Sequence, residues 1–211
     1  MRHKSKWYGI LSLVALSLYG SACGLFDNPV TPTVVDPAPS PPPQRISRSL
    51  PIVYAAQQTQ VWCWAAVSQM VLGYYNVGSV GQCNILTRWT GAPCCTAALP
   101  ICIQAAPDLA FIQATLLEAG GIRSARVRRP LQGTEVIAEI NGNRPFIIAY
   151  QGSFSGHVVV VGGYSINQDG SGLSVDVLDP FYGVYRGVPY ATTFSYGGQL
   201  VWVDTLAGLQ R

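Results

Sequence analysis

The sequence predicts an α+β fold in which a central helix packs against an antiparallel β-sheet. Helical patterns come first in the region after residue 50, and most strand patterns follow residue 145, an order typical of this class. About half of the 211 residues are apolar and only 11% are charged, which supports a packed core and excludes a disordered chain. The length fits one domain with additional segments.

The first 22 residues have the layout of a secretory signal peptide. A basic stretch from Arg2 to Lys6 precedes an apolar run from Trp7 to Tyr19, and small residues follow up to Ala22. The apolar run is shorter than the roughly 20 residues that a membrane-spanning helix needs. Cys23 comes next, so the leader resembles a bacterial lipoprotein signal, whose cysteine is acylated. We expect an exported bacterial protein anchored to the cell envelope, at the outer membrane, through a lipid on Cys23, or otherwise secreted.

Residues 23–49 are predicted to be a tether. Seven prolines lie between Asp27 and Pro43, a composition that favours extended polyproline conformations and gives a semi-rigid spacer. Residues 50–211 are then predicted to be the folded domain.

The formal net charge of +3 comes from the leader. Arg2, Lys4 and Lys6 account for three of the thirteen bases, so the rest of the chain carries ten bases and ten acids. Without a net positive charge or a long basic tract, the mature chain is not expected to bind nucleic acid.

Four cysteines lie within twenty residues of one another, in a chain whose leader directs it to an oxidising compartment. The neighbours Cys94 and Cys95 are poor partners for each other, because a disulfide between them would be strained. Two pairings remain open: Cys83–Cys94 with Cys95–Cys102, or Cys83–Cys95 with Cys94–Cys102. No histidine lies near this cluster, which argues against a zinc site, and we expect neither a metal nor a cofactor.

With Cys23 acylated and the four clustered cysteines paired, Cys63 is the one thiol left over. It begins a predicted helix that is apolar on nearly all sides, which is typical of a buried central helix. At the first turn of a helix, free amide groups and the helix dipole lower a thiol pKa and favour a nucleophilic thiolate. A buried, inert cysteine is the structural alternative. His157 is the only histidine outside the leader, and a single imidazole beside a single thiol favours the catalytic interpretation.

Hairpin geometry predicts a partner for this histidine. His157 begins a strand that runs into a turn at residues 167–172, and the following strand ends at Asp179. A turn centred on residue 168 puts Asp179 opposite His157, with Cβ atoms about 5 Å apart. Asp179 could then accept the imidazole proton and fix its tautomer, whereas Asp176 has the wrong parity.

The other predicted elements form the scaffold. A helix from Asp108 to Ala119 ends at Gly120-Gly121, and a shorter helix is capped by Thr134 and reaches Ile140. The apolar face of the first helix is formed by Leu109, Ile112, Leu116 and Leu117. The remaining predicted strands are 145–150, 184–188 and 200–203. Trp62 and Trp64 are interpreted as packing residues.

From about Leu50 to the C-terminus the sequence resembles the papain-like cysteine peptidases, in particular the small bacterial branch that includes secreted effector proteases of plant pathogens. The resemblance rests on Gln57 six residues before Cys63-Trp64-Ala65-Ala66, on Gly156-His157-Val158 and on Val177-Leu178-Asp179-Pro180.

The resemblance implies Cys63 as nucleophile, His157 as general base, Asp179 as orienting residue and Gln57 as oxyanion donor, with Gln58 as the alternative donor. It also implies a peptide or protein substrate, and we expect a monomer. Two other functions stay open. One is a different amide hydrolase or transamidase acting on cell-wall peptides at the same site, and the other is an inactive module that binds peptides.

Overall fold

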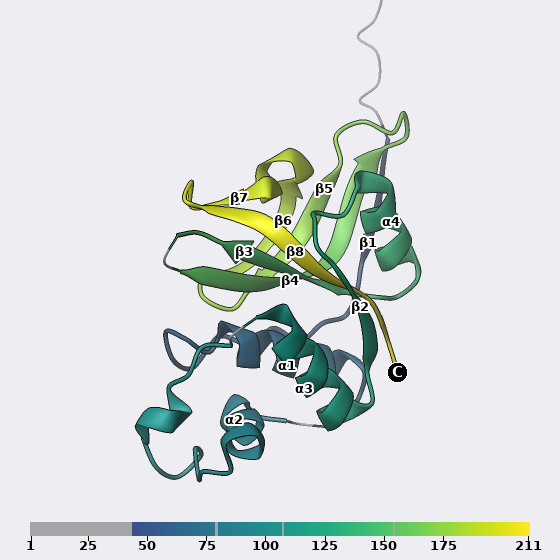
Figure 1. Cartoon of the computed structure of the whole chain (residues 1–211). Helices are drawn as coiled ribbons and strands as arrows, with labels where there is room; N and C mark the ends of the chain where they lie inside the picture. The colour runs from purple at the N-terminus through teal and green to yellow at the C-terminus, as the bar shows by residue number, and fades with distance from the viewer. Residues whose placement is uncertain (1–43, 79, 107, 154) are drawn as a thin grey trace, which may run out of the picture. The chain divides into compact units, whose positions relative to one another are not determined.

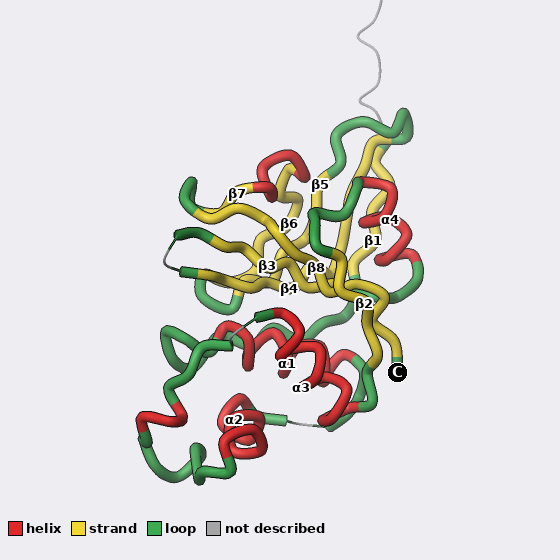
Figure 2. Tube along the Cα trace, in the orientation of Figure 1, coloured by secondary structure: helices red, strands yellow, loops and turns green. Residues whose placement is uncertain are grey.

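The computed structural model describes residues 44–211 except 79, 107 and 154. In this part of the chain, a group of helices lies beneath a curved sheet (Figure 1). The predicted signal peptide, Cys23 and nearly all of the tether lie outside the described residues. Three helices, α1 (Cys63–Tyr74), α2 (Gln82–Thr90) and α3 (Leu109–Gly120), form the helical part, and α4 (Gly133–Asn141) lies beside the sheet (Figure 2).

The sheet has eight strands, and every pair in it is antiparallel. Its main path runs β2-β8-β3-β4-β5-β6, with β1 paired to β4 and β7 paired to β8. The strands are β1 (Arg45–Ser49), β2 (Arg123–Val127), β3 (Phe146–Gln151), β4 (Gly156–Asn167), β5 (Ser174–Asp179), β6 (Gly183–Pro189), β7 (Ser195–Tyr196) and β8 (Leu200–Gln210). Strand β1 belongs to the sheet although the sequence analysis assigned these residues to the tether.

Successive side chains along each strand point to opposite faces of the sheet, so the core is divided into two apolar layers. On one face, residues such as Val160 and Leu178 pack against α1 and α3. On the other face, their neighbours Val159 and Val177 pack with α4 and with residues of β8. The two-residue period of a strand thus lets one sheet cover two apolar layers.

Helix α1 is the buried central helix that the sequence predicts. Eight of its twelve residues are buried, and they face α2, α3 and the sheet. Because its core contacts lie on nearly all sides, the helix needs no polar face.

Two disulfides staple the helical part. Cys83 bonds to Cys95 and Cys94 bonds to Cys102, which is the second of the two pairings left open by the sequence. Cys83 lies in α2 and Cys102 in the short 3₁₀ helix η1 (Pro100–Cys102), so the bridges tie both elements to the neighbouring residues Cys95 and Cys94 in the segment between α2 and α3.

Several local predictions need correction. Leu117 is half exposed and does not belong to the buried face of α3, which is formed by Leu109, Ile112 and Leu116. Thr134 lies inside α4, because Gln132 is the N-cap and forms a capping box with Glu135. The periodicity analysis did not predict α2, β1 or β2, and β8 extends far beyond residue 203.

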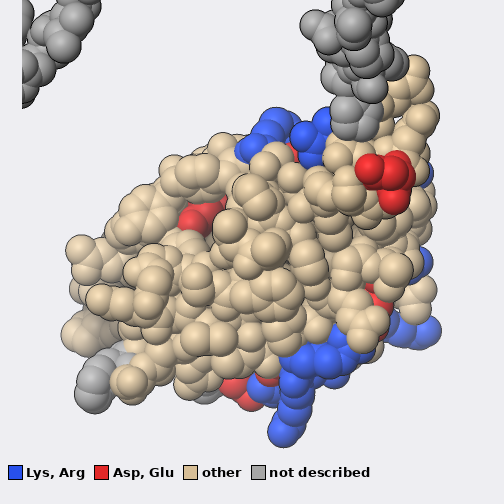
Figure 3. Space-filling model, turned by 90° about the horizontal axis from the view of Figure 1, so that it is seen from above, with Lys and Arg blue, Asp and Glu red and all other residues tan. Residues whose placement is uncertain are grey.

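The surface of the domain carries few charges. On the face shown in Figure 3, most basic and acidic side chains lie near the periphery and the middle of the face is uncharged. Within the described part of the chain, no helix is long and apolar enough to cross a membrane. Residues 44–211, apart from the three gaps, also hold no group of three side chains suited to bind a metal ion.

Candidate active site

Cys63 is the first residue of α1 and the only free cysteine among the described residues. Its backbone N–H belongs to the first turn, where an α-helix offers no internal acceptor. The residue lines a cleft of about 230 Å³ between the helical part and the sheet, and His157 lines the same cleft. The remaining wall residues come from α1, from α3 and the segment before it, and from β2, β3, β4 and β8.

His157 lies near the start of β4, opposite Tyr150 of β3, and its Nε2 is 2.9 Å from Oδ1 of Asp179. The register differs from the predicted one, because Val160 pairs with Leu178 and a bulge follows further along the hairpin. The prediction that Asp179 lies directly opposite His157 was therefore wrong by two residues, because this register puts Val159 opposite Asp179. The two side chains still meet because they lie on the same face, diagonally across the strands, within reach of a long side chain.

Asp179 is almost fully buried, at 1% exposed. Its Oδ1 also accepts hydrogen bonds from the backbone N–H groups of Phe181 and Tyr182, at 2.8 and 3.3 Å, and Oδ2 accepts one from Tyr196 Oη at 2.8 Å. Burial opposes the charged form, but the hydrogen bond and charge of His157 outweigh it, so the pKa of Asp179 is lowered. The residue is both a turn former and a buried carboxylate.

The imidazole has the opposite shift. Burial alone would lower the pKa of His157, but hydrogen bonds to Asp179 and Cys63, together with their charges, raise this pKa to about 9. Cys63, which lines the same cleft, thus contributes to the raised pKa of His157. A protonated imidazole between a carboxylate and a thiol is the arrangement that stabilises a thiolate.

Gln57 lies in the loop before α1, and its backbone N–H donates to the carbonyl of Pro180 at 2.8 Å. Its carboxamide nitrogen donates to the carbonyl of Thr59 at 2.7 Å, while its Oε1 is buried without a hydrogen-bond partner. A carboxamide nitrogen carries two hydrogens, so one donor remains available. Gln58 is exposed, and its backbone N–H is bound to Gln82. Neither glutamine belongs to the residues that line the cleft around Cys63.

Gln82, a buried residue at the start of α2, holds this loop in place. Its Nε2 donates to the carbonyl of Ala56 and to Oε1 of Gln69, at 2.8 and 3.0 Å. Its Oε1 accepts from the N–H of Gln58 at 2.9 Å. One side chain thus connects α1, α2 and the loop that carries Gln57.

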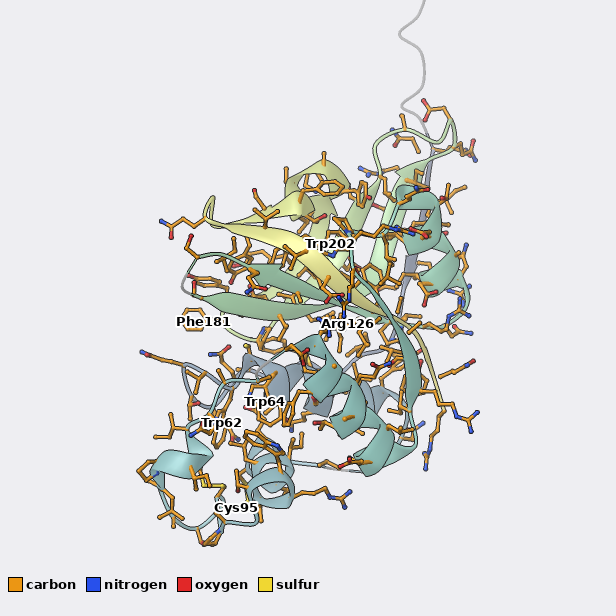
Figure 4. The ribbon with its side chains drawn as sticks, viewed as in Figure 1. Trp62, Trp64, Cys95, Arg126, Phe181 and Trp202 are labelled. Atoms are coloured by element: carbon orange, nitrogen blue, oxygen red, sulfur yellow. A yellow bond between two sulfur atoms is a disulfide. The ribbon has the colours of Figure 1, made fainter. Side chains whose placement is uncertain are left out.

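Trp62 and Trp64 are buried, as predicted for packing residues, but Trp64 also lines the cleft. Both lie close to the disulfide-linked segment beneath the sheet (Figure 4). The indole of Trp62 donates to the carbonyl of Cys102 at 2.8 Å, and that of Trp64 donates to the carbonyl of Gln104 at 2.9 Å. The residues on both sides of Cys63 are therefore tied to the stapled segment.

Sequence reasoning missed two groups at the site. Tyr196 reaches Asp179 from β7, a strand of two residues that has no visible period. Arg126 lies on the cleft wall between two carboxylates, with Nε 2.6 Å from Asp204 and Nη1 2.9 Å from Asp108 (Figure 4). The only sequence signal for Tyr196 was the Gly197-Gly198 turn signal that follows it.

A comparison with protein-family models places the sequence in a known group. Residues 44–194 match the model described as papain-like cysteine protease AvrRpt2. The chain belongs to this family. It is therefore a papain-like cysteine peptidase, a hydrolase with an α+β fold, as the sequence resemblance implied. The start of the match at residue 44 agrees with the inclusion of β1 in the sheet.

Solved structures give weaker likenesses to this peptidase. A double glycine motif protease from an AMS/PCAT transporter, solved in complex with the leader peptide, is 18% identical with a TM-score of 0.49, over 75% of this chain and 91% of that one. UfSP from C. elegans is 13% identical with a TM-score of 0.46, over 82% of this chain and 35% of that one. No curated protein matches the sequence.

Proposed function

We propose that this peptidase hydrolyses peptide bonds through a Cys63–His157–Asp179 triad, with Gln57 as an oxyanion donor. The observation that carries the proposal is the 2.9 Å contact between His157 and Asp179, in a cleft that Cys63 also lines. The raised pKa of His157 supports a protonated imidazole in the resting enzyme.

The reaction follows from these groups. The Cys63 thiolate attacks the peptide carbonyl carbon, a C–S bond forms, and the oxygen becomes an oxyanion. His157 gives its proton to the leaving nitrogen as the C–N bond breaks, which leaves a thioester. Water then attacks the thioester while His157 takes a proton from it, and loss of the thiolate releases the acid and restores the ion pair.

The oxyanion needs donors that are in place before the reaction. The N–H of Cys63 in the first turn of α1 supplies one, and the free hydrogen of the Gln57 carboxamide supplies the second. Gln57 is preferred over Gln58 because Gln58 is exposed, and because the contact with Pro180 holds Gln57 beside the residue that follows Asp179.

Replacement of the nucleophile tests the proposal. In Cys63→Ala, hydrolysis of a denatured protein substrate should fall at least about a thousandfold, because no thioester can form. Ser68→Ala is the matched control, since it removes one side-chain oxygen from the same helix, and it should keep near wild-type activity. Unchanged hydrolysis in Cys63→Ala would remove Cys63 from the mechanism.

We also propose that the peptidase is exported and acylated on Cys23, and that its Pro-rich tether holds it away from the membrane. The leader supports this proposal, because Cys23 follows directly after its small residues. Expression in a bacterium fed with labelled palmitate should give a labelled, detergent-extracted protein, and Cys23→Ala should lose the label. An unlabelled wild-type protein recovered from the medium would contradict the anchor.

A further inference from the structure

The carboxylate that faces His157 has a second partner. Asp179 uses Oδ1 for the imidazole and two backbone N–H groups, and Oδ2 accepts from Tyr196 Oη at 2.8 Å. Among the described residues, Tyr196 is the only hydrogen-bond donor to Oδ2. A carboxylate with both oxygens engaged has little freedom to rotate about its last bond.

The ring of Tyr196 also lies over the imidazole. The centroids of these two rings are 4.7 Å apart, at an interplanar angle of 36°. The Tyr196 ring also packs against the Tyr150 ring, with a centroid distance of 5.2 Å. One side chain thus bonds to the carboxylate and covers the imidazole. Burial and the Asp179 carboxylate raise the pKa of Tyr196, so its hydroxyl stays protonated and can donate at neutral pH.

A tight turn fixes where this side chain lies. Tyr196 pairs with Leu200 across the β7–β8 turn, and Gly197 and Gly198 both have left-handed backbone, at φ 58° and 71°. Glycine adopts these angles without strain, so the turn gives Tyr196 a defined direction over the end of the sheet.

We propose that Tyr196 is a positioning residue of the peptidase, whose hydroxyl holds the Asp179 carboxylate against His157 and whose ring shields that contact from water. The inference rests on the proposed triad. Tyr196 would not touch the reacting atoms, and it would act through Asp179 and His157.

Several titratable groups face these two residues. Cys63 of α1, Asp179 of β5 and Tyr150 of β3 face the imidazole, and Tyr54, Tyr182 and Tyr185 lie near the carboxylate or Tyr196. Arg126, Asp108 and Asp204 line the farther wall of the cleft. Tyr196→Phe leaves all of them unchanged and removes one oxygen.

The test compares Tyr196→Phe with Tyr164→Phe, which also removes one tyrosine hydroxyl, one that donates to Asn141 away from the cleft. Tyr196→Phe should lower kcat about tenfold with KM nearly unchanged, because only the orientation of the general base is lost. Tyr196→Leu, which also removes the ring, should lower kcat further. Tyr164→Phe should match the wild type in both constants.

A titration of His157 by NMR provides a readout that does not depend on activity. The full chain has two histidines, and His157→Gln identifies the signal of His157. In Tyr196→Phe the pKa of His157 should fall by about half a unit or more, because the carboxylate is held less firmly beside the imidazolium. Tyr164→Phe should leave this pKa unchanged.

The outcomes separate the two proposals. Wild-type kcat and an unchanged pKa of His157 in Tyr196→Phe would overturn the positioning role, and so would a rise in KM alone, which would indicate direct substrate contact. A shifted titration in an enzyme that hydrolyses nothing would keep the positioning role and refute the proposed function. If Tyr196→Leu does not fold, Tyr196→Phe alone decides the question.

Discussion

The candidate site residues in the helical part and those in the sheet are held in place by different interactions. Cys63 and Gln57 belong to the helical part, where two disulfides, two indole hydrogen bonds and buried Gln82 fix the chain. His157 and Asp179 belong to the sheet, where ladder hydrogen bonds on both sides of β4 and β5 fix the backbone.

This difference follows from how many contacts each part makes by itself. A strand inside a sheet has its backbone groups paired by its neighbours, so the ladder alone restricts it. Helix α2 and the segment up to residue 106 have only short elements and few buried side chains, and covalent links supply the missing restraint. We expect perturbations of the helical part to change both stability and catalysis, and perturbations of the sheet core to change mainly stability.

The largest expected effect comes from the buried tryptophans. Trp64→Ala and Trp202→Ala each remove a side chain that is at most 2% exposed, and each should lower the free energy of unfolding by about 3–5 kcal/mol. Urea denaturation followed by circular dichroism measures this loss.

The milder variants sharpen the comparison between the two parts. Trp64→Phe should lower kcat/KM several-fold, because Trp64 lines the cleft and its indole holds Gln104. Trp202→Phe should leave kcat/KM near the wild-type value, since the Trp202 indole bonds to Thr205 within the sheet. Equal kinetic losses in both variants would contradict a division between the two parts.

Loss of the proposed oxyanion donor should have the next largest effect. Gln57→Ala should lower kcat about a hundredfold or more, equivalent to roughly 3 kcal/mol of barrier lowering, because a donor aimed at the developing oxyanion is lost. Gln58→Ala is the matched neighbour and should change kcat less than twofold. Steady-state kinetics on one peptide substrate tests both, and the reverse order would assign the donor to Gln58.

Removal of one disulfide should have a smaller effect. The double variant Cys94→Ala/Cys102→Ala should lower the free energy of unfolding by roughly 2–3 kcal/mol, since the bridge closes a short loop in the unfolded chain. Hydrogen exchange should show faster exchange in α2 and η1 while the amides of β3 and β4 stay protected. Uniform loss of protection would mean that the two parts unfold as one unit.

The sequence predicted the parts of the fold whose patterns are local and long. A nearly unbroken apolar stretch predicts helix α1, and a run of valines predicts the strand after His157. It did not predict α2, which has only two buried apolar residues, Ile85 and Leu86. It also did not predict β1, whose five residues are all exposed and which forms only by pairing with β4.

Two sequence features made part of the candidate site predictable: the small number of candidate residues and the position of the turn between two strands. One thiol and one imidazole limited the candidates, and the turn brought position 179 near position 157. Ser165 pairs with Ser174, so the turn is centred beyond residue 168, and the bulge between Val161 and Gly163 then shifts the β4–β5 register by one residue, which no turn residue signals. Tyr196 reaches Asp179 through tertiary structure alone, as do Arg126 and its two carboxylates.

The smallest expected effect is the pH dependence of the contact on the sheet side. The pKa of His157 is raised from 6.5 to about 9, so its stabilising contribution is complete below pH 6.5 and is lost as the pH rises through 9. The pKa of Asp179 is lowered, so its contribution is present above its ordinary value near 3.8 and is lost as the pH falls through the lowered pKa. The two contributions therefore coincide between about pH 4 and pH 6.5.

His157→Gln should accordingly lower the free energy of unfolding by about 1–2 kcal/mol more at pH 6 than at pH 10. Ser68→Ala, in the helical part, should cost the same at both pH values, because its hydroxyl bonds to the Trp64 carbonyl and does not titrate there. Urea denaturation at the two pH values measures both differences. A pH-independent cost for His157→Gln would mean that the ion pair with Asp179 contributes nothing to stability, and the sheet would then hold its half of the site by backbone pairing alone.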